Sequence, residues 1–441
     1  MATFQRKIAI GDLTLGMYVS KLDCPWHMTP FPIQGFYIDC EEDVTSLAGF
    51  CKFVFIDTLR SKSPQSYKSS QSNKSKEATS KSSRSNSKQN INSGDTNVHT
   101  RTHKVLVRRP VKYEIKVSFK KELKKAQSIY HDLDRTVTAM ATQLQNRTEV
   151  DIASAVESTK LAVASIVRNP DAMIWVTKMK REGTPLYQHA INCAIWAAIL
   201  GREIGLPEHK LETLAAGVVL CKVGLFMLPS SPDAATEFSG IRENPLYKKH
   251  VTLALKLLGQ SRSLSKDIIN TIATHEERFN GSGFPQQLKD TAIPLFGQIA
   301  GLVDYYETSI SSQLNATPLS PADALSAMYQ ERDHLFQSEL IESFIQALGL
   351  FPPGTIVKLN NQHVGVVTSN QKNKRLQPEI IMVLDENKTT VKHRILDLYA
   401  YNQNPSDEPL EIECCLPAGS YDIDISTLYR KAPSFLLGLF S

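Results

Sequence analysis

Apolar and polar residues alternate with a period of two near both ends of the chain. Residues 5–59 contain the runs KIAIGDLTLGMYVSKLD and FCKFVFIDT, with Gly-Met and Gly-Phe turns between them. Residues 354–400 contain TIVKLNN, QHVGVVTSN and EIIMVLDEN. Because successive side chains of a strand point to opposite faces, this alternation is typical of strands. A further run, HKVLVRRPVKYEIKV at 103–117, also favours strand and could complete the N-terminal sheet.

Between residues 118 and 350 the apolar residues take the spacing of helices. Ile191, Ala194, Ile195 and Ile199, for example, form one stripe, because positions three and four apart share a helix face. Asn169-Pro170 reads as the end of one helix and the start of the next. The pattern predicts helices at 119–145, 149–168, 170–181, 187–206, 211–229, 244–259, 263–276, 293–310 and 321–334.

These patterns divide the chain into four parts. A small β-containing domain occupies residues 1–59, and a helical bundle occupies 118–350. A β-rich module with a loop-rich tail occupies 351–441, and residues 60–104 link the first domain to the rest. The predicted fold class is therefore mainly α, with a small β domain on either side of the bundle.

The segment 60–104 has the composition of a disordered linker. It holds ten Lys or Arg against Glu77 and Asp95, and thirteen serines fall between residues 61 and 93. So few large apolar side chains cannot offset the entropy lost on ordering. A basic segment can bind nucleic acid or anionic lipid. We expect a soluble spacer instead, and nucleic acid is not the predicted partner, because the charges are not interleaved with aromatic residues for stacking.

Charge, hydropathy and cysteine content indicate the cellular compartment of the protein. The net charge of +5 is the sum of +8 in the linker and −3 elsewhere. No run of about 18 apolar residues is present, so no membrane span is expected, and the N-terminus lacks the apolar core of a signal peptide. The seven cysteines show no C-x-x-C spacing. We therefore expect a cytoplasmic protein with reduced thiols.

The stretch TIATHEERFNGSGFP at 271–285 is the strongest candidate for a functional site. A helical run ends in His275-Glu276-Glu277-Arg278, and a Gly-Ser-Gly turn and Phe284-Pro285 follow. Two glycines allow a sharp turn and a close approach to a ligand. An ordinary helix end followed by a loop is the alternative interpretation of this stretch alone.

Taken with the rest of the bundle, these motifs resemble the HD-GYP family of metal-dependent phosphohydrolases. His189 lies in Y-x-H-A-x-N, and Asp304 lies in V-D-Y-Y-E, as the family's first and last ligands do. The defining His-Asp pair aligns with Cys221-Lys222, and the second His of the H-H-E-R motif aligns with Glu276. The positions that match the family's metal ligands are His189, Cys221, Lys222, His250, His275, Glu276 and Asp304.

The resemblance extends to the loop after the helix and to the N-terminal domain. The family's R-x-D-G-x-G-Y-P reads here as R-x-N-G-x-G-F-P. The candidates for ligand contact are Arg278, Asn280, Gly281, Gly283 and Phe284. Residues 5–59, with GMYV, PW and F-x-x-Q-G-F, look like a domain of unknown function that often precedes HD-GYP domains. Its expected role is partner contact or dimerisation.

The substitutions change what the site can hold. The family's metals polarise phosphate and activate water. Lys222 instead places an ammonium among the acidic groups, so we expect it to pair with Asp304, together with Glu276, in place of a metal. The predicted cofactor is therefore none. The alternative is one Fe, Mn or Zn ion held by His189, His250, His275, Glu276 and Asp304, with Cys221 able to ligate as a thiolate.

The sequence thus predicts a degenerate HD-GYP-like signalling protein without catalytic residues. Such a protein would act as a binding or protein-interaction module, and the resemblance implies cyclic di-GMP as its small-molecule partner. A residual metal-dependent cyclic di-GMP phosphodiesterase with an altered metal site is the alternative. The sequence does not specify the protein partner, and it is compatible with a homodimer.

Overall fold

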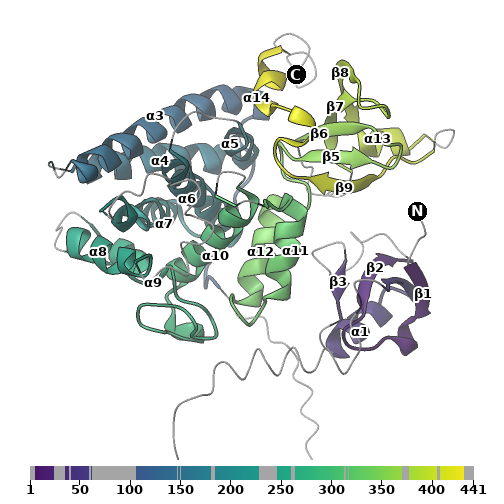
Figure 1. The fold of residues 1–441 in the computed structure, drawn as a ribbon, viewed down its shortest axis with the longest axis horizontal. Coiled ribbons are helices and arrows are strands. Elements are labelled where there is room, and N and C mark those ends of the chain that lie inside the picture. The colour runs from purple at the N-terminus through teal and green to yellow at the C-terminus, as the bar shows by residue number, and fades with distance from the viewer. Residues whose placement is uncertain are drawn as a thin grey trace, which may run out of the picture. The chain divides into compact units, whose positions relative to one another are not determined.

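The computed structural model describes residues 5–23, 35–38, 41–58, 61, 106–146, 148, 150–179, 184–227, 246–259, 264–311, 314–315, 317–369, 377–404 and 408–431. The chain forms two compact units, Met1–Val105 and Leu106–Ser441 (Figure 1). The predicted disordered linker lies, except for Ser61, outside the described residues.

The N-terminal unit contains one antiparallel sheet and one helix. Its strands are β1 (Gln5–Ala9), β2 (Tyr18–Leu22), β3 (Phe36–Tyr37) and β4 (Phe53–Asp57), in the order β1-β4-β2-β3. Helix α1 (Glu41–Ala48), which the sequence pattern did not predict, precedes β4. The core of the unit includes Val19, Leu47, Val54 and Ile56, all of which are buried.

The strand predicted at 103–117 is wrong over its described part. Residues 106–117 form no strand and belong to the second unit. Val111 donates its N–H to the carbonyl of Gly205, and the Tyr113 hydroxyl donates to the carbonyl of Leu206. Gly205 has a φ of +81°, and a Cβ there would lie 2.5 Å from Pro110. Residues 106–117 therefore contact the bundle through the backbone of Val111 and the side chain of Tyr113, while Val111 and Ile115 expose 41% and 53% of their surface.

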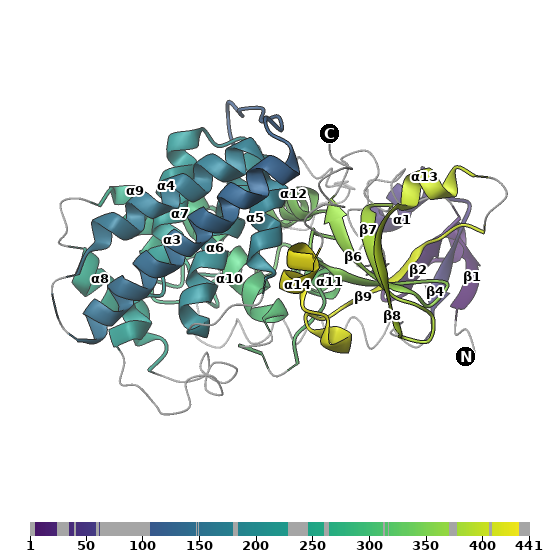
Figure 2. The same cartoon turned by 90° about the horizontal axis from the view of Figure 1, so that it is seen from above.

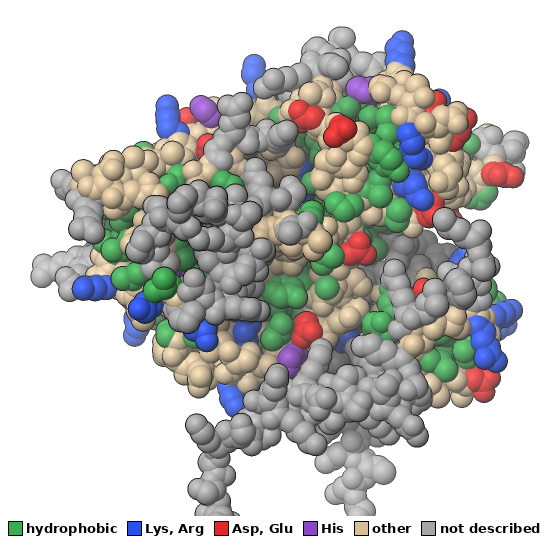
Figure 3. Space-filling model, viewed as in Figure 1, with side chains coloured by type: hydrophobic (Ala, Val, Ile, Leu, Met, Phe, Trp, Pro, Cys, Tyr) green, Lys and Arg blue, Asp and Glu red, His purple; other side chains and the backbone are tan. Residues whose placement is uncertain are grey.

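The second unit begins with a helical bundle, as predicted. Its elements are α3 (Phe119–Gln145), α4 (Ile152–Arg168), α5 (Pro170–Thr177), α6 (Pro185–Glu203), α7 (Glu208–Leu220), α8 (Lys249–Leu258), α9 (Lys266–Thr274), α10 (Leu295–Ile310), α11 (Pro321–Gln330) and α12 (Ser338–Leu348). Helices α3, α4 and α6 pack against one another (Figure 2). On the face shown in Figure 3, Lys and Arg side chains (blue) are scattered over the surface of the bundle.

The first helices are tied together by a buried ion pair. Glu122 of α3 is fully buried, and its carboxylate accepts hydrogen bonds of 2.9 and 2.6 Å from the guanidinium of Arg168 at the end of α4. Ser165 donates a third bond of 2.7 Å to the same carboxylate. Burial alone would raise the pKa of Glu122, but these bonds hold it below its usual value. The pair fixes α3 against α4.

Helix α6 is the centre of the bundle, and the helix after it is shorter than predicted. Every residue of α6 from Tyr187 to Arg202 is buried. The helix predicted at 211–229 ends at Leu220, and a 3₁₀ turn, η3 (Val223–Met227), follows. At Gly224 a Cβ would collide with the carbonyl of His250, so only glycine allows this close approach. The break leaves Lys222 on a turn inside the bundle.

The C-terminal part of the second unit is a five-stranded antiparallel sheet. Its strands are β5 (Ile356–Leu359), β6 (Val364–Ser369), β7 (Glu379–Leu384), β8 (Thr390–Asp397) and β9 (Ile412–Leu416), in the order β8-β7-β6-β5-β9. Val357, Val367 and Ile380 form part of its core. The tail, predicted to be rich in loops, also forms α13 (Leu398–Asn402), β9 and α14 (Ile425–Lys431).

Candidate functional site

The structure brings the predicted metal-ligand positions together inside the bundle. His189 comes from α6, His250 from α8 and Asp304 from α10. The pair Cys221-Lys222 follows α7, and His275-Glu276 follows α9. All seven side chains are buried, with at most 3% of any residue exposed.

The ammonium of Lys222 lies at the centre of this group. Its Nζ is 2.7 Å from Oε1 of Glu276 and 3.1 Å from Oδ1 of Asp304. It also donates a hydrogen bond of 3.0 Å to the hydroxyl of Tyr247, which in turn donates to Glu276 over 2.6 Å. Lys222 thus joins carboxylates from two separate elements, as a bound cation would.

The charge of Glu276 is compensated from two sides. Burial would raise the pKa of this carboxyl, but the ammonium of Lys222, together with His275 and Arg278, holds the pKa well below its usual value. Arg278 adds a second cation, with its guanidinium 3.2 Å from Oε2 of Glu276. Two acidic and two basic groups therefore balance one another without an added ion.

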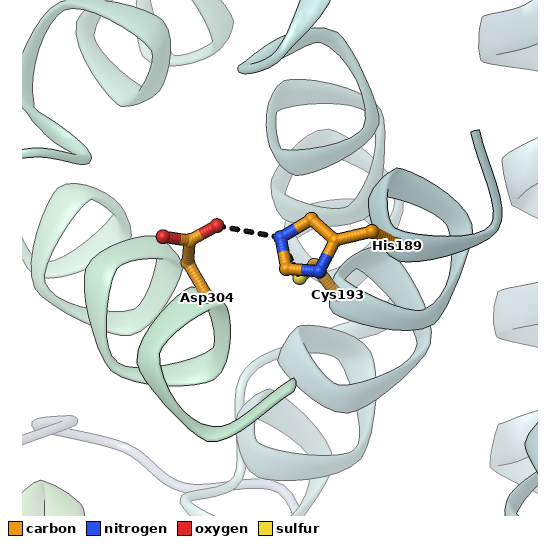
Figure 4. Close-up of side chains that lie close together, drawn as sticks. All are labelled: His189, Cys193 and Asp304. Carbon is orange, nitrogen blue, oxygen red and sulfur yellow. Dashed lines mark hydrogen bonds and ion pairs between the residues drawn. The ribbon is translucent and has the colours of Figure 1, made fainter. Parts of the chain in front are cut away.

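His189 and Asp304 form a second contact, to which a cysteine contributes (Figure 4). Nε2 of His189 is 2.7 Å from Oδ1 of Asp304 and 3.5 Å from Sγ of Cys193. The three side chains could hold a metal, as their ligand atoms lie within 4.8 Å of one another. Burial raises the pKa of Cys193 well above its usual value, which favours the thiol over the thiolate that metals require. Cys193 was not among the residues predicted from the sequence, although it lies one helical turn after His189.

His250 and His275 face each other through their Nε2 atoms, which are 3.0 Å apart. Each Nδ1 lies at hydrogen-bond distance from a carbonyl, of Tyr247 at 2.6 Å and of Ile272 at 2.9 Å. A carbonyl can only accept, so each Nδ1 carries a proton and each neutral ring presents an Nε2 lone pair. Burial, followed by the charge of Lys222, lowers the pKa of His250 to about 4 and that of His275 to about 3. The two lone pairs converge as they do at metal sites.

Cys221 is turned away from these groups. Its Sγ donates to the carbonyls of Gly217 and Thr271, at 3.2 and 3.9 Å. Burial raises the pKa of its thiol above the usual value. It therefore does not take the place of the family's histidine as a ligand in this structure.

The loop after His275 is anchored by Glu277, which the sequence analysis did not single out. Its buried carboxylate accepts hydrogen bonds from the backbone N–H groups of Gln286, at 2.7 Å, and Leu288, at 2.9 Å. On the other side of the loop, Nδ2 of Asn280 lies 3.1 Å from Nε2 of His334. These contacts fix the loop on both sides.

The two glycines of the loop are packed against this chain itself. A Cβ at Gly283 would lie 2.4 Å from the backbone of Glu276, and one at Gly281, where φ is +78°, would meet Lys289. The close approach expected for a ligand is thus made by the chain's own atoms at these two positions. Phe284 is half-buried, with its ring centroid 6.2 Å from that of Tyr247.

A second polar layer lies beside the first, between α6 and α10. Glu307 accepts hydrogen bonds from Asn192, at 2.8 Å, and from the indole of Trp196, at 2.7 Å. The ammonium of Lys178 lies 5.2 Å from the centre of the Trp196 ring. Burial lowers the pKa of Lys178 to about 8, and Glu307 offsets only part of this effect. The layer carries charge deep into the bundle next to His189 and Asp304.

The donor set does not fit the metal centre of the family. The Lys222 ammonium stands in for the aspartate that would bridge the ions and contacts two of the remaining carboxylates. A divalent ion about 4 Å from this ammonium would be repelled by about 8 kcal/mol at an effective dielectric constant of 20. The ammonium and a multinuclear metal site therefore exclude each other unless Lys222 loses its proton.

Two family models match the chain. A domain of unknown function, DUF3391, matches residues 5–155, and an HD domain matches residues 174–340. A cyclic di-GMP phosphodiesterase of Pseudomonas aeruginosa is 23% identical over 289 residues, which are 64% of this chain and 68% of that protein. A cyclic di-GMP phosphodiesterase of Borreliella burgdorferi is 25% identical over 205 residues, 46% of this chain and 54% of that protein.

A third relative, a cyclic di-GMP phosphodiesterase of Vibrio cholerae, is 32% identical over 148 residues, 32% of this chain and 30% of that protein. The chain thus spans about two thirds of the Pseudomonas protein and about half or less of the other two. Among solved structures, an HDGYP protein of Bdellovibrio bacteriovorus matches with a TM-score of 0.40 at 13% identity, over 78% of this chain and 99% of that one.

No helix in the described part of the chain is long and apolar enough to cross a membrane. The HD model covers α6 to α10, and these helices with the turns after α7 and α9 supply His189, Lys222, His250, Glu276 and Asp304. The chain therefore contains an HD domain preceded by a DUF3391 region, and cyclic di-GMP phosphodiesterases are among the proteins to which it is similar.

Proposed function

We propose that this chain is an HD-GYP-family signalling protein that binds without hydrolysing, because an ammonium replaces its metals. The observation that carries the proposal is the position of Lys222, within 2.7 Å of Glu276 and 3.1 Å of Asp304. Hydrolysis of a phosphodiester at an HD site depends on a metal-activated water. A lysine that neutralises the ligand carboxylates supplies no such water, but it keeps the bundle folded around the site.

The small-molecule partner in this proposal is cyclic di-GMP or a related dinucleotide. Relatives that match the HD domain are named as cyclic di-GMP phosphodiesterases. Arg278 and Asn280 offer a cation and an amide at the loop that follows the central cluster, and Phe284 offers a half-exposed ring. A protein partner would then distinguish the domain with the dinucleotide bound from the free domain.

Three measurements on the full chain test the proposal. We expect elemental analysis of protein purified without chelator to find well under one equivalent of Fe, Mn or Zn. We also expect no turnover of cyclic di-GMP with added Mn²⁺ or Fe²⁺, while calorimetry detects binding. Turnover that a chelator abolishes would refute the loss of catalysis. Absence of binding would refute the assignment of cyclic di-GMP as the ligand. The role of the domain would then be interaction with a protein.

Residual metal-dependent hydrolysis is the second candidate function, and the two histidines favour it. The Nε2 lone pairs of His250 and His275 converge next to Glu276, and these three residues could hold one ion. This candidate requires that Lys222 withdraw or lose its proton. A stoichiometric metal in the wild-type protein, lost on changing His250→Ala, would support it over the first.

A further inference from the structure

The outer face of the N-terminal sheet carries aromatic rings between lysines. On β4, Val54 and Ile56 are buried in the core, whereas Phe53 and Phe55 point to the opposite face and are half-buried. Their ring centroids are 5.8 Å apart at an interplanar angle of 79°. We call this surface the phenylalanine face; it comprises Phe53, Phe55, Lys7 and Lys21.

Two exposed lysines flank the rings. The register pairs Phe55 with Lys7 of β1 on one side and, beyond a bulge, with Lys21 of β2 on the other. Residues directly opposite in an antiparallel sheet share a face, so all three side chains lie on the same surface. Within the part of the chain that the structure describes, neither lysine takes part in a salt bridge. Their charge is therefore available to a partner.

Both phenylalanine side chains are half-buried, and Lys7 lies over one of them. The ammonium of Lys7 is 3.4 Å from the centre of the Phe53 ring and covers that face, so a base that stacks on Phe53 must displace Lys7. Asp57 shares the face at the end of β4, where it pairs with Tyr18 and Gln5. At the start of β4, the Asp23 carboxylate accepts hydrogen bonds from the backbone N–H groups of Lys52, at 2.8 Å, and Phe53, at 3.2 Å. The two lysines thus lie beside Phe55, and a carboxylate lies at each end of β4.

We propose that the phenylalanine face binds single-stranded nucleic acid. Aromatic rings on a sheet between cations are the arrangement by which proteins stack bases and neutralise phosphates. Strands β1 and β2 lie on either side of β4, about 10 Å apart, since neighbouring strands are about 4.8 Å apart. Two flexible lysines at that separation can reach the phosphates on both sides of a base stacked on Phe55. An acidic peptide would use the lysines but leave the rings without a stacking partner.

This surface differs from the basic linker, for which the sequence analysis did not predict nucleic acid. The linker was not predicted to bind nucleic acid because its basic residues are not interleaved with aromatic residues for stacking. On the phenylalanine face, strands that are distant in sequence pair and so bring aromatic and basic side chains together. This face lies within the region matched by the domain of unknown function, and its residues belong to the first compact unit, whereas the HD site belongs to the second.

Fluorescence anisotropy of the full chain with a labelled 12-nucleotide oligo(U) RNA and the matching oligo(dT) DNA tests the proposal. We expect binding at 50 mM salt that weakens as salt rises. Phe55→Leu should weaken it at least about fivefold, equivalent to about 1 kcal/mol. The pair Lys7→Gln with Lys21→Gln should reduce the slope of log K against log salt by about 1.4, because each phosphate contact on a single strand contributes about 0.7.

Matched controls separate this face from other basic surfaces. Lys124→Gln with Lys125→Gln removes the same charge from the exposed side of α3 and should leave binding unchanged. Circular dichroism checks that Phe55→Leu still folds, and the lysine pair, being exposed, tests the face without touching the core. No binding by the wild type, equal loss in the control, or loss only on deleting residues 62–102 would overturn the proposal. Binding of an acidic peptide but of neither oligonucleotide would also overturn it.

Discussion

Replacing Lys222 tests whether its ammonium holds the site together. At an effective dielectric constant of 20, attraction over the observed 2.7 and 3.1 Å amounts to about 6 kcal/mol to Glu276 and about 5 kcal/mol to Asp304. Desolvation of the three buried charges offsets several kcal/mol for each ion. Removing one partner of a buried pair nevertheless costs about 3–5 kcal/mol, because the remaining charges stay buried without compensation. We expect Lys222→Met, which keeps most of the packing, to lower the free energy of unfolding by that amount.

Double variants distinguish lost charge from lost packing. In Lys222→Met with Glu276→Gln, the carboxylate nearest to the lysine is also neutralised, so we expect at least about 2 kcal/mol of the loss to be recovered. Lys222→Met with Asp304→Asn should recover less than this, since His189 also contacts Asp304. Lys210→Met is the control, because Lys210 pairs over the same 2.7 Å with Asp267 but both side chains are over 40% exposed. It should cost under about 1 kcal/mol.

Urea unfolding followed by circular dichroism gives these free energies. An effect of Lys222→Met no larger than that of Lys210→Met would refute the role of the ammonium as the replacement for the metals. Simple additivity in both double variants would refute it as well, since it would show that the charges do not interact.

Three further predictions concern other parts of the chain. Cys221→His with Lys222→Asp should restore metal binding, so elemental analysis after purification with Mn²⁺ or Fe²⁺ should find about one equivalent or more; no gain would show that other losses abolish the site. Lys178→Met should stabilise the protein by up to about 3 kcal/mol at pH 7, because the folded-state pKa of about 8 lies below the usual lysine value of 10.5. Burial of the charged Lys178 destabilises the protein in full below pH 8, and this destabilisation disappears as the pH rises toward 10.5. The stability gained by Lys178→Met should therefore fall to about 1 kcal/mol at pH 10. A gain that does not depend on pH would show that the buried charge is not its cause. Deleting residues 62–102 should leave the unfolding transition nearly unchanged, and a large fall in the melting temperature would show that the segment packs on the body.

Helices with strong local signals could be predicted from the sequence. Helix α3 runs from Phe119 to Gln145, the predicted bounds, because its amphipathic stripe continues over its whole length. Asn169-Pro170 separates α4 from α5 as expected, with the Asn169 side chain capping α5. The sequence pattern did not predict the end of an element where that end depends on a contact with a residue far along the chain. The end of α7 depends on the contact of Gly224 with His250, which no local pattern contains.

The residues that form the site could be predicted from the sequence, but the contacts among them could not. Motif order identified the ligand positions, yet it gave Asp304 as the main partner of Lys222, whereas the shorter contact is to Glu276. Tyr247, in the turn before α8, and Cys193, on α6, were not predicted as site residues, because a single tyrosine or cysteine among apolar residues carries no signal of its own. Their spacing from His250 and His189, three and four residues, is the clue that the sequence offers.

The ion pair between Glu122 and Arg168 has a consequence for dissecting the protein. The DUF3391 match ends at residue 155, but the first compact unit ends at residue 105. The region that the family model matches is therefore longer than the compact unit. A fragment cut at 155 would keep Glu122 and discard the guanidinium that compensates it. Expression of the N-terminal region alone should therefore stop before residue 106, and the bundle should be produced with its leading segment from that residue onward.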